Sequence, residues 1–80
     1  MRDNVVLITG AARGIGAAVA RQMVADGARV ALVGLEPALL AALTAELGAS
    51  AAWWLADVTD QVALDIAVAS AHAHFGRIDV

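Results

Sequence analysis

Short apolar runs alternate along the chain with longer segments whose apolar residues recur at helical spacing. Runs of four to six apolar residues are typical of strands buried on both faces of a parallel sheet. Segments with apolar residues three or four positions apart are typical of amphipathic helices. The pattern predicts strands at residues 4–9, 29–33 and 51–56, and helices at residues 14–26, 37–47 and from about 61 to about 75.

Helix boundaries and buried faces are also marked in the sequence. Glycines follow the first two predicted helices as C-terminal caps, a proline suits the first turn of the second helix, and Thr59 or Asp60 is expected to cap the third. The expected apolar faces are Ile15, Val19 and Met23 on the first helix, and Leu39, Leu40, Leu43 and Leu47 on the second.

Strictly alternating strands and helices with short connections predict an α/β fold. Such connections give parallel strand pairing and right-handed crossovers. The order βαβαβα corresponds to one nucleotide-binding half of a doubly wound parallel sheet. Residues 78–80 are expected to begin a fourth strand, so we interpret residues 1–80 as a partial domain truncated at its C-terminus.

The composition agrees with an incomplete unit. Of the 80 residues, 61% are hydrophobic and only 16% are charged. A chain of this size has too few charges to cover all its faces, so we expect it to oligomerise or to belong to a larger protein.

The charge distribution argues against several classes of partner. The formal net charge is −3, and the five basic residues are dispersed arginines, so nucleic-acid binding is not expected. Cysteine is absent, which removes disulfides and cysteine metal sites and fits a reducing compartment. No run approaches the ~18 consecutive apolar residues of a membrane helix, and a cytoplasmic protein is the expectation.

The segment Thr9-Gly10-Ala11-Ala12-Arg13-Gly14-Ile15-Gly16 joins the first predicted strand to the first predicted helix. Gly10 stands where the chain must turn sharply, and Gly14 and Gly16 lie at the helix start. Missing Cβ atoms there let a phosphate approach the free N–H groups at the positive end of the helix dipole. The segment predicts phosphate binding; the alternative is a turn whose glycines serve packing only.

That segment resembles the TGxxxGxG signature of the short-chain dehydrogenase/reductase family. The resemblance extends to Asp57-Val58-Thr59-Asp60, after the third strand, and to Phe75-Gly76-Arg77-Ile78-Asp79-Val80, before the fourth. These motifs occur in the family's order and cover essentially the whole chain. The resemblance implies a Rossmann-like fold and an NAD(P)-dependent oxidoreductase that moves hydride between nicotinamide and an alcohol or carbonyl substrate.

The resemblance also implies a set of cofactor-binding residues. Asp57 would accept a hydrogen bond from the adenine amino group, and Val58 would contact the ring through its backbone. The alternative for Asp57 is a loop carboxylate near a helix start. The residues implied around the pyrophosphate and neighbouring ribose are Gly10, Ala12, Arg13, Gly14, Ile15 and Gly16.

The sequence favours NADP over NAD as the cofactor. NAD-preferring relatives usually carry Asp at the position of Gly34, where a carboxylate would repel a 2′-phosphate. Glu36 lies two residues further on, before Pro37, where a helix start is the expected role; the alternative is that its carboxylate reaches round to the ribose. Arg13 occupies a position that is often basic in NADP-preferring relatives, and its guanidinium can pair with the 2′-phosphate. A solvated surface charge is the alternative for Arg13.

The residues of the family's chemistry are missing from this sequence. The chain contains no Tyr and no Lys, and it lacks the Asn-Asn-Ala-Gly element after the fourth strand. We therefore predict no catalytic residue here and an inactive isolated chain. The resemblance implies a longer parent enzyme that is a homo-oligomer. The alternatives are a nucleotide-binding or redox-sensing module that never catalyses, or another Rossmann-like protein.

Two further pairs of residues are assigned to structure. His72 and His74 are two positions apart on a helix and point to different faces, so a shared metal is not expected. Trp53 and Trp54 are neighbours in a strand and face opposite sides of the sheet. We expect one to pack under a helix and the other to serve core packing or an interface; the alternative for the second is a position near the adenine.

Overall fold

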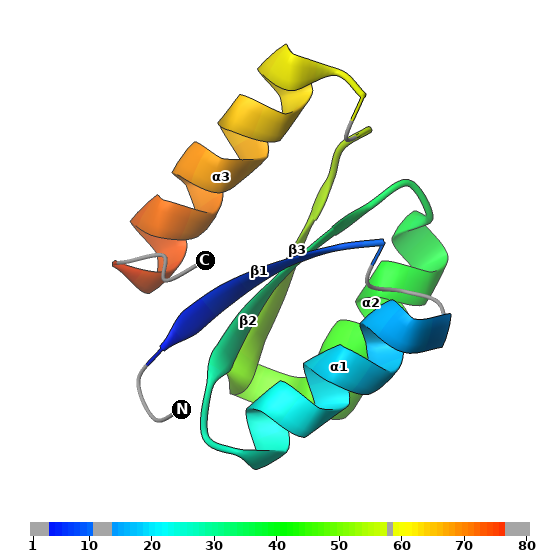
Figure 1. Ribbon diagram of the computed structural model, residues 1–80, viewed down its shortest axis with the longest axis vertical. Helices are drawn as coiled ribbons and strands as arrows, with labels where there is room; N and C mark the ends of the chain where they lie inside the picture. The colour runs from blue at the N-terminus through cyan, green and yellow to red at the C-terminus, as the bar shows by residue number, and fades with distance from the viewer. Residues whose placement is uncertain (1–3, 11–13, 58, 77–80) are drawn as a thin grey trace.

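The computed structural model describes residues 4–10, 14–57 and 59–76, and these form alternating strands and helices (Figure 1). The order follows the sequence pattern throughout, with one short 3₁₀ turn that the pattern did not predict. The described helices are too short or too polar to span a membrane. The elements are β1 (Val5–Thr9), α1 (Gly14–Ala25), β2 (Arg29–Gly34), α2 (Pro37–Leu47), η1 (Gly48–Ser50), β3 (Ala51–Leu55) and α3 (Gln61–Phe75).

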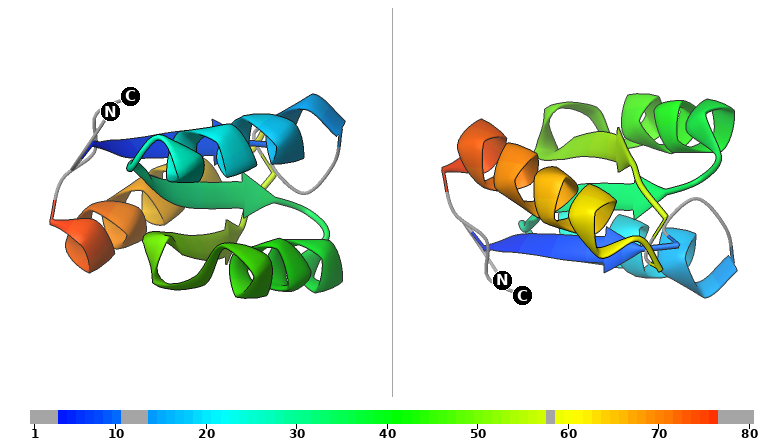
Figure 2. Two further views of the ribbon diagram at one scale, coloured as in Figure 1. Left: turned by 90° about the horizontal axis from the view of Figure 1, so that it is seen from below. Right: turned by 90° about the horizontal axis from the view of Figure 1, so that it is seen from above.

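The three strands form one parallel sheet in the order β1-β2-β3. Helices α1 and α2 cover one face of this sheet and α3 covers the other, which gives three layers (Figure 2). This arrangement confirms the predicted α/β fold with parallel pairing. The predicted start of a fourth strand, residues 78–80, lies outside the described residues.

The ends of α3 show why the local sequence forms a helix there. Asp60 is the N-cap, and its side chain accepts a hydrogen bond from the Ala63 N–H at 3.1 Å. Gly76 ends the helix in the left-handed conformation (φ 85°) and donates its N–H to the His72 carbonyl at 2.7 Å. Of the two predicted caps, Asp60 is therefore the correct one, and Thr59 bonds elsewhere.

Most of the core lies between the sheet and the α1–α2 layer. Val30 and Leu32 of β2 and Leu40 of α2 are fully buried there. On the opposite face a smaller cluster forms around Val33, Ala56 and Ala67, so α3 is held by fewer buried side chains. Among the described residues no polar or charged side chain is buried.

Two residues assigned to buried helix faces lie at the surface instead. Ile15 is 84% exposed because the buried face of α1 is formed by Ala17 and Ala20, and Ile15 points away from that face. Leu39 is 41% exposed because Leu40, Leu43 and Leu47 already form the inward face, and Leu39 falls on its flank. The predicted faces were otherwise correct, with Val19 and Met23 packed against the core.

The two tryptophans face opposite sides of the sheet, as predicted. Trp53 packs with the α1–α2 core and Trp54 with the α3 cluster. The Trp54 ring makes edge contacts with His74 and Phe75, with centroid separations of 5.9 and 6.5 Å. Arg29 at the start of β2 lies over the Phe75 ring at 5.7 Å, so the C-terminal end of α3 is held by aromatic contacts.

Candidate functional site

The carboxyl ends of the three strands meet at one edge of the sheet. The Gly10 N–H donates to the Val33 carbonyl at 2.9 Å, and the Ala56 N–H donates to the Gly34 carbonyl at 3.0 Å. These bonds continue the parallel register one residue past the strands. They bring the segments after β1, β2 and β3 together at the edge where open α/β sheets bind their ligands.

Gly10 and Gly14 flank the connection from β1 to α1 in conformations that favour glycine. Both have positive φ, 61° and 51°. A Cβ added to either would meet no described atom within 4 Å. Packing between described residues therefore does not require glycine there, whereas the backbone conformation favours it and the space above the backbone is open.

Helix α1 begins at this open space, at Gly14. The first N–H groups of a helix have no partner within the helix, and they lie at the positive end of its dipole. Ile15 is exposed and Gly16 is half-buried in the same first turn. The start of α1 can therefore accept an anion such as a pyrophosphate, which is the chemistry that the glycine segment predicts.

Asp57 follows β3 after one intervening residue, Ala56, and is exposed at the same edge. Its Oδ1 accepts hydrogen bonds from the backbone N–H of Thr59 at 2.9 Å and from the Thr59 hydroxyl at 2.7 Å. These bonds lower the pKa of the Asp57 carboxyl, the backbone bond most, because they stabilise its charged form. A carboxylate held charged in this way is a suitable acceptor for an amino group.

Replacing Thr59 by alanine is expected to raise the Asp57 pKa part of the way toward its ordinary value, because the backbone bond remains. With a lowered pKa in the folded chain, Asp57 contributes stability above its unfolded pKa, and this contribution is lost as the pH falls through the folded value. Thr59→Ala therefore weakens folding at neutral pH more than in acid. Carboxyl NMR titration measures the shift, and Thr44→Ala, which removes a hydroxyl bonded to the Leu40 carbonyl, is the control. An unchanged Asp57 pKa would contradict the role of the hydroxyl.

The end of β2 carries no acidic side chain at the edge. Gly34 closes the strand, and a Cβ added to it would lie 3.6 Å from the Leu40 methyl groups, an ordinary contact. Glu36 is the N-cap of α2, as its position before Pro37 predicts, and it is half-buried. Its carbonyl accepts the Leu40 N–H at 3.0 Å, while its carboxylate makes no capping bond.

Several predicted site residues lie outside the described residues, namely Ala12, Arg13 and Val58. The residues brought together at the edge are Gly10, Gly14, Ile15, Gly16 and Asp57. Leu35, which is 62% exposed next to Gly34, was not predicted to lie at this edge. Its place between a strand and a polar helix start is a pattern from which its exposure could have been predicted. Among the described residues no group of His, Cys, Asp or Glu could hold a metal.

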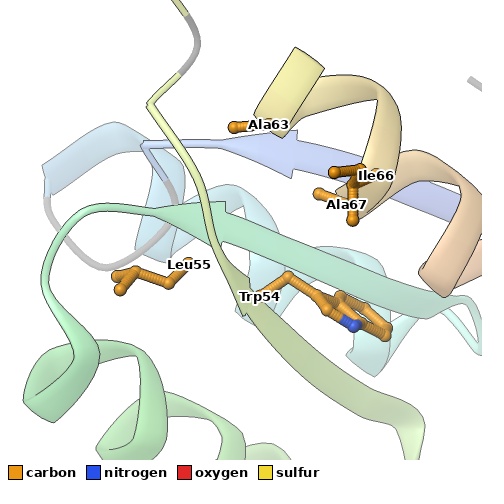
Figure 3. Close-up of a pocket in the computed structure, with 5 residues that line it drawn as sticks. All are labelled: Trp54, Leu55, Ala63, Ile66 and Ala67. Carbon is orange, nitrogen blue, oxygen red and sulfur yellow. The ribbon is translucent and has the colours of Figure 1, made fainter. Parts of the chain in front are cut away.

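A separate pocket of about 220 Å³ lies between β3 and α3 (Figure 3). It is lined by Trp54, Leu55, Ala63, Ile66 and Ala67. Apart from the indole N–H of Trp54 these side chains are apolar, and none carries a charge that would attract a phosphate. The pocket is therefore distinct in chemistry from the edge formed by the glycines and Asp57.

Comparisons with known proteins agree with this arrangement. The family model described as short chain dehydrogenase matches residues 4–80. Sorbitol dehydrogenase of Cereibacter sphaeroides is 45% identical over 74 residues, covering 92% of this chain and 29% of that protein. Momilactone A synthase of Oryza sativa subsp. japonica is 46% identical over 78 residues, covering 96% of this chain and 28% of that protein.

A solved structure has a fold that closely matches that of this chain. The 3-ketoacyl-(acyl-carrier-protein) reductase of Brucella melitensis, complexed with NADH, superimposes with a TM-score of 0.94 and 33% identity. The match covers 98% of this chain and 32% of the reductase, so the chain spans about a third of the length of that protein. Fold, motifs and relatives agree, and the chain belongs to the short-chain dehydrogenase/reductase family.

Proposed function

We propose that residues 1–80 form the cofactor-binding N-terminal part of an NAD(P)-dependent oxidoreductase that acts on an alcohol or carbonyl substrate. The observation that carries the proposal is the open space at the start of α1, where Gly10 and Gly14 have positive φ and no described neighbour would contact an added Cβ. The bound nicotinamide would supply the hydride acceptor or donor. This chain would hold the adenosine and pyrophosphate half of the cofactor.

The residues assigned to cofactor binding lie in two segments. The first would hold the pyrophosphate with the backbone N–H groups at the start of α1, which need no side chain. In the second, Asp57 would accept a hydrogen bond from the adenine amino group, and Val58 would contact the ring through its backbone. The first segment comprises Gly10, Ala12, Arg13, Gly14, Ile15 and Gly16.

NADP is the proposed cofactor, with NAD as the alternative. Gly34 presents no carboxylate to repel a 2′-phosphate, and Arg13 supplies a cation near the glycine turn. The solved reductase of Brucella melitensis is complexed with NADH, so the family fold also accommodates NAD. The end of β2 is the place where the two cofactors are distinguished.

Substituting Gly34 by aspartate is expected to shift the ratio of NADP to NAD affinities at least ~10-fold toward NAD, because the new carboxylate repels the 2′-phosphate. The site accepts the change, since an added Cβ makes only an ordinary contact with Leu40. Equilibrium titration with both dinucleotides measures the ratio in the parent enzyme. Ala45→Asp, which adds the same charge on an exposed position of α2, is the control. An unchanged ratio in Gly34→Asp would contradict this assignment.

The chemical step is assigned to residues outside this sequence. The family uses a Tyr and a Lys for proton transfer, and the chain contains neither. We therefore propose that later segments of a longer parent carry catalysis and select the substrate. We further propose that this parent is cytoplasmic and homo-oligomeric. The same absence favours the alternative of a nucleotide-binding or redox-sensing module without catalysis.

Two measurements distinguish these functions. The intact mass of the natural protein is expected to exceed that of the 80-residue chain, with Tyr and Lys in the continuation. The isolated chain is expected to leave the nicotinamide absorbance unchanged when alcohols or carbonyl compounds are added. A natural protein of only 80 residues would contradict the proposed enzymatic function and favour the binding module. Turnover by the isolated chain would contradict the assignment of the chemical step to other segments.

A further inference from the structure

Thr59 holds the Asp57 carboxylate in one orientation, in the segment that joins β3 to α3 (Figure 1). Two donors of Thr59 converge on the same carboxylate oxygen, Oδ1: the backbone N–H at 2.9 Å and the hydroxyl at 2.7 Å. Rotation of the carboxylate would break both bonds at once. Thr59 therefore fixes the direction in which the carboxylate points as well as its charge.

The backbone of Asp57 is held to the start of α3. The Asp57 carbonyl accepts the Asp60 N–H at 2.9 Å, and the Asp60 side chain accepts the Ala63 N–H at 3.1 Å as the helix cap. The Asp60 carbonyl also accepts the Leu64 N–H at 3.0 Å. The helix therefore sets the position of the Asp57 backbone, and Thr59 sets the orientation of its side chain.

The second oxygen of this carboxylate, Oδ2, is available at the carboxyl edge of the sheet. Asp57 is exposed, and no residue in the described part of the chain donates a hydrogen bond to Oδ2. An ionised carboxylate has only acceptor sites, and Oδ1 already accepts two donors. Asp57 therefore offers a ligand one oriented, charged acceptor, which pairs with an N–H group and repels a carbonyl oxygen.

We propose that Thr59 is a positioning residue that directs Asp57 Oδ2 toward the 6-amino group of the adenine, so that the chain prefers a 6-aminopurine dinucleotide to its 6-oxopurine analogue. This inference rests on the proposed cofactor binding and adds a base specificity to it. Adenine carries a donor at position 6, and hypoxanthine carries an acceptor there. A charged acceptor aimed at that position gains a hydrogen bond with adenine and is repelled by the oxygen of hypoxanthine.

The need for Thr59 follows from where each base carries its donor. Hypoxanthine also has a donor, its N1–H, one ring position away from its oxygen. A carboxylate that is free to rotate can turn toward this N–H and accept it, which would reduce the discrimination between the two bases. A carboxylate whose Oδ1 is held by both donors of Thr59 loses these bonds when it turns. The bonds from Thr59 therefore make the Asp57 acceptor selective.

Calorimetric titration of the folded 80-residue chain with NADP and with its deaminated analogue, nicotinamide hypoxanthine dinucleotide phosphate, tests the base specificity. The chain is expected to bind NADP at least ~10-fold more tightly than the analogue. Equal binding of the two would overturn this inference and leave the proposed cofactor binding intact. Failure to bind either dinucleotide would overturn the proposed cofactor binding and this inference with it.

Thr59→Val tests the positioning role, because valine keeps the branched shape and the backbone N–H but removes the hydroxyl. Thr59 is exposed, so circular dichroism should show an unchanged fold. The ratio of the two affinities is expected to fall at least ~3-fold, whereas a loss of stability alone would weaken both dinucleotides in proportion.

Two further variants control for the chemical change in Thr59→Val. Thr59→Ser keeps the hydroxyl and should keep the affinity ratio within ~2-fold of the original. Thr44→Val removes a hydroxyl that bonds to the Leu40 carbonyl at 2.8 Å, and it should also leave the ratio within ~2-fold. An unchanged ratio in Thr59→Val, or an equal fall in Thr59→Ser, would overturn the assignment of Thr59.

Discussion

A chain in which valine replaces Gly14 is expected to bind nicotinamide dinucleotides at least ~100-fold more weakly. Gly14 has φ 51°, a conformation that β-branched residues avoid. The open space around it would also be filled by the valine methyl groups at the start of α1, where the pyrophosphate is proposed to meet the backbone. Both effects would weaken binding of the pyrophosphate at the start of α1. Calorimetric titration with NADP and NAD measures the loss.

Gly48→Val provides the matched control for Gly14→Val. Gly48 also has a positive φ, 74°, and an added Cβ would likewise meet no described atom within 4 Å. It lies at the C-terminal end of α2, whereas the proposed site faces the start of that helix. Gly48 has ψ −147°, a region that essentially only glycine occupies, so we expect Gly48→Val to strain the backbone strongly and still to retain dinucleotide binding. Equal loss of binding in both variants would mean that strain, not occupation of the site, is responsible.

Replacing Leu40 by alanine is expected to destabilise the chain by ~2–5 kcal/mol, enough to unfold most of it. Leu40 is fully buried between α2 and the sheet, and its methyl groups lie beside Gly34. A chain of this length buries only ~60% of its unfolded surface, so its margin of stability is small. Urea denaturation followed by tryptophan fluorescence measures the loss.

Leu39→Ala tests the same chemical change one residue away. Leu39 is 41% exposed on the same helix, so its truncation is expected to cost less than ~1 kcal/mol. The unsubstituted chain itself is expected to unfold over a broad temperature range, because β1 has only one strand partner in the described sheet. Equal effects of the two leucine substitutions would contradict the assignment of Leu40 to the core, and sharp, cooperative melting would contradict the expected weak stability.

The elements were predictable from the sequence because local signals and tertiary packing agree. The helix that begins after Asp60 and ends at Gly76 has a side-chain N-cap and a left-handed C-cap, both visible in the residue types. The strands were predictable because a parallel sheet covered on both faces requires continuous apolar runs. Observed strand and helix ends differ from the predicted ones by one residue at most.

The sequence could not show which of several helical positions faces the sheet, or how one element lies across another. Ile15 has helical spacing with Val19 and Met23, but only the packed helix shows that the buried face is centred on Ala17 and Ala20. Leu39 likewise fits a leucine stripe, and only the packed helix shows that Leu40 takes the inward position. The contact of Trp54 with His74 depends on how α3 lies across the sheet, which no local pattern determines.

The candidate site was predictable in part for the same reason. The glycine segment between strand and helix is a local pattern with a known physical role, so Gly10 and Gly14 could be identified directly. The bonds from Thr59 to Asp57 were not predicted, because Thr59 was considered only as one of two candidate helix caps. The openness around the glycines depends on the absence of described neighbours, which only the folded chain reveals.

The most direct test of the central claim is an amide NMR titration of the folded 80-residue chain with NADP and with NAD. The account predicts saturable shifts concentrated at the carboxyl edge, at Gly10, Gly14 to Gly16 and Asp57, with little change at the pocket formed by Trp54 and Ile66. A folded chain whose edge amides do not respond at millimolar dinucleotide, or whose shifts concentrate at the pocket, would contradict it.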